Sequence, residues 1–362
     1  MYNTNIKQIE LELTSKCNAA CPQCPRNFHG GKTWGNLPLV NWELQALKDS
    51  FAEPIKTIKH LRLCGTYGEP TVYPQFHEFV SWVITNSDCD ITINSNAGAR
   101  SNDWWKTLGG ILGDRGKVYF GIDGLEDTHA LYRRGTDFNR VIAHATNFIS
   151  GGGTAVWSML AFKHNQHQVE TARQMSIDIG FESFAVKSTS RFVDKTHRLI
   201  DRSPVYNRKG ELEYYLEPTN DERYVNKGYK EYVGLINDNG GHLDAIQNIK
   251  VDCIAVKYGG VSISAEGYVF PCGFLLDRLY GQEAESHPDH ARLIQMINDN
   301  GGYDAINIKK NRLVDIINGD LFKNIKASWT TKSLERCAQQ CGVGNTLLKN
   351  ANNDLAKTWS KF

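Results

Sequence analysis

Three cysteines near the start of the chain have a spacing that could hold a metal centre: Cys17, Cys21 and Cys24. They follow an alternating run, Gln8–Thr14, that predicts a strand leading into a loop. Thiolates bind soft metals and are the usual ligands of iron–sulfur clusters. Three thiolates would leave one iron of a four-iron cluster open to another ligand. The alternatives are a structural zinc site with His29 as fourth ligand, or buried thiols without metal.

Four further cysteines lie in the second half: Cys253, Cys272, Cys337 and Cys341. The first two flank alternating runs that predict a β-hairpin, with Gly267 at a turn position that needs a positive φ. The last two are four residues apart, so a helix would place them on one face. Together they could ligate a second cluster or a structural zinc ion.

The first half of the chain alternates short apolar runs with helical stretches. Six such repeats predict parallel βαβ units in an α/β fold, an open, partial (β/α)6 TIM-like barrel. In such folds the reactive groups lie on loops at the carboxyl ends of the strands. The predicted strands are Ile9–Leu13, His60–Cys64, Asp90–Asn94, Lys117–Asp123, Thr154–Leu160 and Ser183–Lys187. The predicted helices are Asn41–Phe51, Pro74–Thr85, Asp103–Leu112, Phe138–Ser150 and Gln166–Ile179.

Polar side chains follow the second, third and fourth predicted strands. Cys64–Pro70 has two glycines, which let a backbone approach a ligand closely, and Glu69, a carboxylate suited to a ligand ammonium. Asn94–Gly98 is small and polar, which suits sugar hydroxyls. Asp123 and the pair Arg133-Arg134 lie on or after the fourth strand. Each stretch is also compatible with a plain turn or a surface ion pair.

The charge of the chain is balanced, with 41 lysines and arginines against 40 aspartates and glutamates. The chain therefore lacks the excess of positive charge that favours binding to nucleic acid. No apolar stretch reaches membrane-spanning length, and the first residues lack the regions of a signal peptide. We therefore expect a cytoplasmic protein without nucleic acid or membrane as partner. Nine cysteines in a reducing compartment favour metal binding or catalysis over disulfides.

The ordered set Cys17-x3-Cys21-x2-Cys24, Gly68-Glu69-Pro70 and Asn94–Gly98 resembles the radical S-adenosylmethionine (SAM) superfamily. Gly121–Arg134 is similar to the Asp-Gly…His…Arg segment of its peptide-modifying branches. One departure is Gln23, where the superfamily often has an aromatic residue. The resemblance implies a [4Fe–4S] cluster on the three cysteines, with SAM chelating the open iron. The SAM contacts that it implies are Gly68, Glu69, Ser95, Asn96, Asp123 and Arg133, or Arg134 in place of Arg133.

The same resemblance implies the reaction. One electron from a flavodoxin- or ferredoxin-type reductant would cleave SAM to methionine and a 5′-deoxyadenosyl radical, which abstracts hydrogen from a substrate. The resemblance favours a peptide or protein substrate, although the first cysteine is at position 17 and we expect no amino-terminal leader-binding domain. One alternative is radical dehydrogenation of a small molecule such as an amino-sugar alcohol. A zinc-stabilised binding protein is the non-enzymatic alternative.

Cys253-x13-Gly267-x4-Cys272 is similar to the opening signature of the auxiliary-cluster extension called SPASM, or twitch in its shorter form. Four cysteines imply the twitch form with one auxiliary [4Fe–4S] cluster, although the final Cys-x3-Cys departs from the usual Cys-x2-Cys. Its implied ligands are Cys253, Cys272, Cys337 and Cys341. Cys64 and Cys89 are then left over, and Cys64 could be a buried thiol or a hydrogen donor.

These features divide the chain into four parts: a barrel over 1–190, a connector or substrate-facing segment over 191–250, a twitch domain over 251–345 with an insertion at 275–312, and a tail over 346–362. The twitch domain is expected to be small and α+β, a hairpin plus helices. An internal repeat, Ile236–Lys250 and Ile297–Lys309, predicts a helix that ends at glycine and a second short helix. Two copies are too few for a solenoid, but they could be docking elements.

Overall fold

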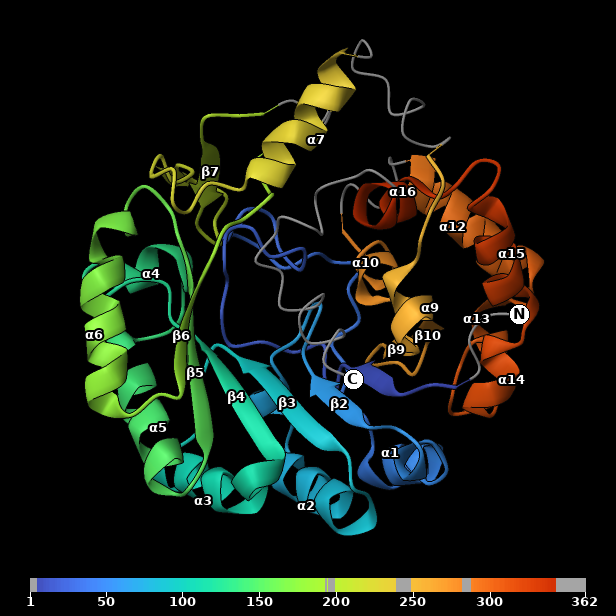
Figure 1. The fold of residues 1–362 in the computed structure, drawn as a ribbon, viewed down its shortest axis with the longest axis horizontal. Helices are drawn as coiled ribbons and strands as arrows, with labels where there is room; N and C mark the ends of the chain where they lie inside the picture. Colours follow the sequence, from blue (N-terminus) through green and yellow to red (C-terminus); the bar gives the residue numbers. More distant parts are fainter. Residues whose placement is uncertain (1–4, 193, 195–198, 239–248, 282–287, 343–362) are drawn as a thin grey trace.

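A computed structural model describes residues 5–192, 194, 199–238, 249–281 and 288–342. Its centre is a curved sheet of eight strands in the order β10-β9-β1-β2-β3-β4-β5-β6 (Figure 1). Strands β1 to β6 pair in parallel and in chain order. Their bounds are β1 Gln8–Leu11, β2 His60–Leu63, β3 Asp90–Ser95, β4 Gly116–Gly121, β5 Thr154–Leu160 and β6 Ser183–Lys187.

Helices cover the outer face of this sheet (Figure 1). They are α1 Leu44–Phe51, α2 Phe76–Asn86, α3 Asn102–Leu112, α5 Phe138–Ser150 and α6 Val169–Ile179. The short helix α4 His129–Tyr132 lies at the strand ends, where Tyr132 packs with Phe162 and Cys21. Side-chain caps begin several of them: Ser101 accepts from the Trp104 amide before α3 (3.2 Å), and Asp137 accepts from the Arg140 amide before α5 (2.8 Å). The partial (β/α)6 barrel predicted from the sequence is confirmed.

The two faces of the sheet differ in chemistry. On β1, Ile9 and Leu11 are fully buried in the apolar core beneath the helices. The intervening residues face the other side, because side chains alternate along a strand. There Glu10 is level with Arg62 of β2 and with Ser262 of the second half. Burial raises the pKa of Glu10, and the Arg62 charge opposes this rise. The residue types at this level make the inner face of the barrel polar.

The predicted hairpin of the second half extends the barrel sheet. Strands β9 Gly260–Ile263 and β10 Val269–Phe270 are antiparallel, and Gly267 in their turn has a φ of 99°. Strand β9 also pairs in parallel with β1, which places Val261 opposite Ile9. The remaining elements are α9 Ile254–Tyr258, α10 Gly273–Leu276, α12 Pro288–Asp299, α13 Gly302–Ala305, α14 Leu313–Ile317, α15 Asp320–Ser328 and α16 Glu335–Cys341.

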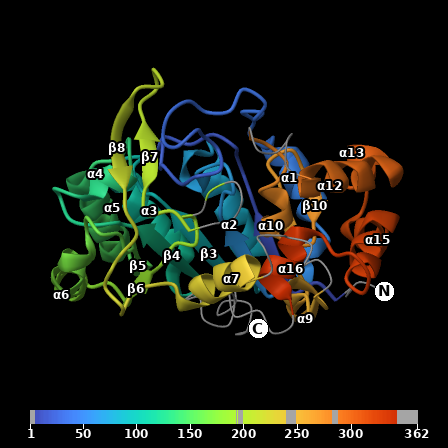
Figure 2. The same ribbon diagram turned by 90° about the horizontal axis from the view of Figure 1, so that it is seen from above.

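The segment between the two halves contains an antiparallel pair, β7 Ser203–Tyr206 and β8 Leu212–Leu216, and helix α7 Lys227–Asp238. The pair lies beside the loop that follows β1 (Figure 2), where the Tyr206 amide donates to the His29 carbonyl (3.0 Å). Helix α7 packs against α16 through Ile236 and its neighbours. The sequence did not predict the β7–β8 pair.

The second copy of the repeat has the expected form: α12 ends at Asp299, Gly301 has a φ of 93°, and the short helix α13 follows. In the first copy α7 ends at Asp238, and residues 239–248 lie outside the described residues, as does the predicted tail 346–362. None of the helices that the structure describes has the length and apolarity to cross a membrane.

Candidate functional site

The first three cysteines lie together in the loop after β1. The Cys24 amide donates to the Cys21 carbonyl (3.0 Å), and the Ala19 amide donates to the Cys17 sulfur (3.4 Å). Burial raises the pKa of the Cys21 thiol to about 11, although the nearby Arg133 guanidinium opposes the rise. Burial also raises the pKa of Cys17, and the neighbouring thiols add to it. These groups would become thiolates only beside a strong positive charge, such as that of metal ions.

Two polar residues of the same loop join it to the ends of other strands. Arg26 is buried, and its guanidinium donates to the Tyr67 carbonyl (2.7 Å) and the Ser15 carbonyl (3.3 Å). The Gln23 amide oxygen accepts from the Thr189 hydroxyl (2.9 Å) just after β6. The polar side chain of Gln23 is therefore satisfied by a hydrogen bond, and the loop is tied to the segments that follow β2 and β6.

Glu69 is buried after β2 and joins two strand ends. Its Oε1 accepts hydrogen bonds from the Thr71 amide (3.1 Å), the Thr71 hydroxyl (2.7 Å) and the Ser95 hydroxyl (2.7 Å). Its Oε2 accepts from the Asn96 amide (2.8 Å). The sequence suggested that this carboxylate meets a ligand ammonium, but here four protein donors already contact it. Through these hydrogen bonds, Glu69 holds the loops after β2 and β3 together.

Gly68 lies where two backbones meet. A Cβ atom at this position would stand 1.7 Å from the Thr14 carbonyl oxygen, so only glycine fits. The Gly68 and Tyr67 amides both donate to Glu12 Oε1, at 2.8 and 2.7 Å. Burial raises the pKa of Glu12 to about 8, while these two amides oppose the rise. Glu12 thus positions the predicted SAM loop against the end of β1.

The third strand end contacts the cysteine loop directly. The Asn96 side-chain amide lies 3.7 Å from the Cys17 sulfur and donates to the Asn18 side chain (3.1 Å). The Ser95 hydroxyl is turned toward Glu69. The predicted residues of the second and third strand ends therefore lie beside the predicted cluster ligands.

Asp123, which is fully buried, forms an ion pair with the partly buried Arg133 after β4. Arg133 Nε lies 2.6 Å from Asp123 Oδ2, and Arg133 Nη1 lies 3.9 Å from the Cys21 sulfur. Burial alone would lower the pKa of Arg133, but Asp123 and Cys21 raise it overall, so the guanidinium stays charged. Arg134 turns away to the Tyr206 carbonyl and Glu213. Of the two arginines, Arg133 is the one beside the cysteines.

His129 supports this ion pair. Its Nδ1 accepts from the Asp123 amide (3.3 Å), and its Nε2 contacts the Thr136 hydroxyl (2.9 Å). Because that hydroxyl donates to the Arg133 carbonyl (2.7 Å), Nε2 is the protonated nitrogen. Burial lowers the pKa of His129 to about 4, which keeps the ring neutral near pH 7.

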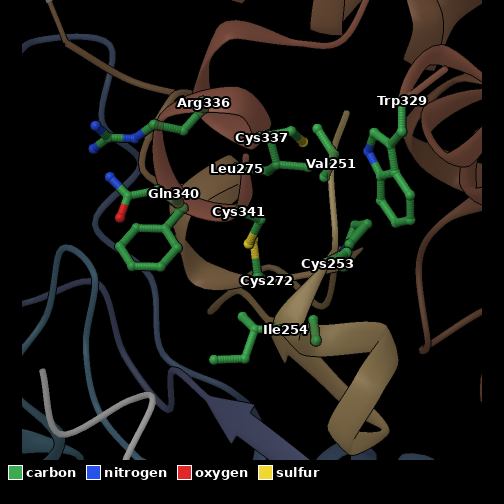
Figure 3. Close-up of a pocket in the computed structure, with 13 residues that line it drawn as sticks. Val251, Cys253, Ile254, Cys272, Leu275, Trp329, Arg336, Cys337, Gln340 and Cys341 are labelled. Carbon is green, nitrogen blue, oxygen red and sulfur yellow. The ribbon is translucent and has the colours of Figure 1, made fainter. Parts of the chain in front are cut away.

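The other four cysteines line one pocket (Figure 3). Cys253 and Cys272 directly precede α9 and α10, while Cys337 and Cys341 lie one turn apart on α16. Burial raises the pKa of Cys272 to about 12, and the Cys253 thiol adds to this. All four are free thiols, and the pocket wall is otherwise mainly apolar.

Comparisons with known proteins agree with this arrangement. Residues 253–342 match the SPASM family, described as an iron-sulfur cluster-binding domain. No curated protein sequence matches the chain. Streptococcus suis SuiB bound to S-adenosylmethionine aligns over 92% of this chain and 72% of that chain, with a TM-score of 0.56 and 14% identity. Hexahistidine-tagged anSMEcpe with bound AdoMet aligns over 98% and 91%, with a TM-score of 0.54 and 14% identity.

A third similar structure is SuiB bound to precursor peptide SuiA, which covers 89% of this chain and 67% of that chain, with a TM-score of 0.55 and 15% identity. At these identities the likeness concerns the fold. The chain shares the fold of these SAM-bound structures, and its residues 253–342 match the SPASM family. The predicted cofactors, [4Fe–4S] clusters and SAM, agree with the SPASM match and with these SAM-bound structures.

The thiols present are the donor type of iron–sulfur clusters. Three lie in the loop after β1, and four line the SPASM pocket. A four-iron cluster takes one thiolate on each iron, so three thiolates leave one iron open and four complete the set. The residues present therefore fit two such clusters.

Several site residues carried no clear signal in the sequence. Glu12 could have been noticed as a charged residue at an inward position of a predicted strand. Arg26 and Trp329 follow no motif, and only the folded chain brings them to the two thiol sites. Cys64 is half-buried after β2, and burial raises its pKa to about 12, whereas Cys89 is fully buried.

Proposed function

We propose that this chain is a radical SAM enzyme that removes a hydrogen atom from a peptide or protein substrate. The observation that carries the proposal is the pair of separate thiol sites, one at the mouth of the barrel and one in the SPASM domain. Cys17, Cys21 and Cys24 would hold the first [4Fe–4S] cluster. Cys253, Cys272, Cys337 and Cys341 would hold one auxiliary cluster.

The residues around the first site would bind and orient SAM. The backbone of Gly68 and the polar groups of Ser95 and Asn96 border the cysteine loop, where they can meet the amino group and the ribose. Arg133, kept charged by Asp123, suits the SAM carboxylate. Glu69 fixes the position of the Ser95–Asn96 segment by accepting hydrogen bonds from both residues.

When bound and reduced, the first cluster supplies the electron that cleaves SAM to methionine and a 5′-deoxyadenosyl radical. The chain's own residues orient SAM and keep water from the reaction. The polar row of Glu10, Arg62 and Ser262 on the inner face of the barrel would hold polar groups of a substrate. A flavodoxin- or ferredoxin-type protein would deliver the electron.

A peptide substrate is supported by SuiB, which is structurally similar and is bound to a precursor peptide in one structure. The β7–β8 pair stands beside the cysteine loop, on a segment suited to contact such a substrate. We accordingly propose that residues 1–190 bind SAM, 191–250 face the substrate, and 251–345, with the insertion 275–312, carry the auxiliary cluster.

Anaerobic reconstitution followed by incubation with SAM and dithionite tests the reaction. The chain is expected to form 5′-deoxyadenosine, and a variant with Cys17→Ala, Cys21→Ala and Cys24→Ala is expected to form none. The substrate class is tested with extracts of cells grown on deuterated amino acids. Deuterium that enters 5′-deoxyadenosine from the peptide and protein fraction supports the proposal, whereas transfer only from the small-molecule fraction contradicts the substrate assignment.

A further inference from the structure

Trp329 places a buried N–H donor at the wall of the SPASM pocket. The residue is 7% exposed, and its Nε1 has no hydrogen-bond partner within the part of the chain that the structure describes. In Figure 3 the nitrogen-bearing edge of the indole is turned toward the cysteines. Buried donors almost always have an acceptor. The unpartnered N–H therefore points to an acceptor that belongs in the pocket.

The Cys337 sulfur is a possible acceptor for this donor. Cys337 and Trp329 line the same pocket, and the Cys337 side chain is buried. Figure 3 shows the nitrogen-bearing edge of the indole on the side of Cys337. Arg336 also lines this pocket, but its guanidinium forms an ion pair with the Asp277 carboxylate (2.7 Å).

We infer that the Trp329 N–H donates a hydrogen bond to the auxiliary cluster, at the Cys337 sulfur or an adjoining sulfide, and raises its reduction potential. The inference rests on the proposed function, since it takes the four thiols as cluster ligands. Reduction adds negative charge to the cluster, and a donated hydrogen bond stabilises the more negative state. Trp329 would therefore make the auxiliary cluster a better acceptor of an electron from the reacting substrate.

The test compares two tryptophan variants in the Cys17→Ala, Cys21→Ala, Cys24→Ala background, where only the auxiliary cluster remains. Trp329→Phe keeps an aromatic ring but removes the donor. Trp157→Phe is the matched control, because this buried indole donates to the Ile122 carbonyl (3.0 Å) inside the barrel. The potential is measured by redox titration followed by electron paramagnetic resonance.

At a fixed applied potential, Trp329→Phe should increase the ratio of oxidised to reduced cluster about tenfold, a shift of about 59 mV for one electron. Trp157→Phe should leave the ratio unchanged. An unchanged potential in Trp329→Phe overturns the inference. A background variant that binds no iron would instead contradict the proposed auxiliary cluster itself, so the two failures are distinguishable.

A second measurement keeps the test decisive if Trp329→Phe loses its cluster. The background variant is produced with tryptophan labelled with ¹⁵N in the indole ring and its cluster is reduced. Trp329 is the tryptophan that lines the pocket, so one ¹⁵N hyperfine coupling to the cluster is expected. The coupling should persist in Trp157→Phe. A spectrum without ¹⁵N coupling overturns the inference.

Discussion

At the scale of single residues, buried carboxylates join loops that are far apart in the sequence. Glu12 accepts from the amides of Tyr67 and Gly68, and Glu69 accepts from groups after β2 and β3. Asp123 pairs with Arg133 and accepts from the Leu160 amide (2.5 Å). In each case one carboxyl group accepts hydrogen bonds from several donors at once, which fixes the backbone around the first thiol site.

Glu69→Gln tests this role at the predicted SAM site. The amide would turn an N–H₂ group toward donors that now meet a carboxylate. Hydrogen bonds to charged groups contribute about 1.5–3 kcal/mol, so we expect SAM to bind roughly tenfold to a hundredfold more weakly. Calorimetric titration of the anaerobic protein with SAM measures the change. The control is Glu43→Gln, an exposed cap of α1, which should leave the affinity unchanged. Equal affinity in Glu69→Gln would show that the loops hold without this carboxylate.

Glu12 gives a prediction for pH. Burial raises its pKa from about 4.5 to about 8, so the folded protein binds a proton that the unfolded chain has already lost. The contribution of Glu12 to stability is therefore complete below about pH 4.5 and is lost as the pH rises through about 8.

Glu12→Gln removes this titration and keeps an oxygen for the two amides. Between pH 5 and 7.5 the unfolding free energy of the unmodified protein should fall relative to the variant, by up to about 1.4 kcal/mol per pH unit. Denaturant unfolding at a series of pH values measures the difference. A constant difference between the two proteins would mean that Glu12 does not titrate in this range.

At the scale of elements, helix α7 supports the helix that carries two auxiliary cysteines. Ile236 is fully buried with Tyr232 and Val233 against Ala338 of α16. Truncation of such a side chain to alanine costs about 2–5 kcal/mol. Ile236→Ala should therefore loosen α16 and speed the loss of auxiliary iron to a chelator, with the first cluster unaffected.

The control on the same helix is Leu235→Ala, because Leu235 is 42% exposed. Iron release should match that of the unmodified protein in this variant. If Ile236→Ala also releases iron at the unmodified rate, α7 does not stabilise the auxiliary site.

Local sequence signals predicted some elements and missed others for physical reasons. Buried parallel strands such as β5 are continuous apolar runs, and α5 has a regular apolar stripe, so both were predicted residue for residue. The β7–β8 pair was missed because Pro204 disfavours a strand and the mostly exposed Leu212–Leu216 stretch lacks a clear alternation of apolar and polar residues. The parallel contact of β9 with β1 joins distant segments and leaves no local pattern.

At the scale of the whole molecule, the contact of β9 with β1 makes one sheet of the barrel and the SPASM hairpin. Tyr67, from the predicted SAM loop, donates to the Leu276 carbonyl of α10 (3.2 Å), close after Cys272. The two thiol sites are thus parts of one packed structure. The motifs predicted both sites from the cysteines, but their common framework depends on tertiary contacts that only the fold reveals.

The most direct test counts iron and acid-labile sulfide in the anaerobically reconstituted chain. Two four-iron clusters predict about eight iron atoms per chain, and about four in the variant with Cys17→Ala, Cys21→Ala and Cys24→Ala. A variant with alanine at Cys253, Cys272, Cys337 and Cys341 should also retain about four. Stoichiometric zinc in place of iron, with no 5′-deoxyadenosine formed from SAM, would contradict the account and make the chain a structural metalloprotein.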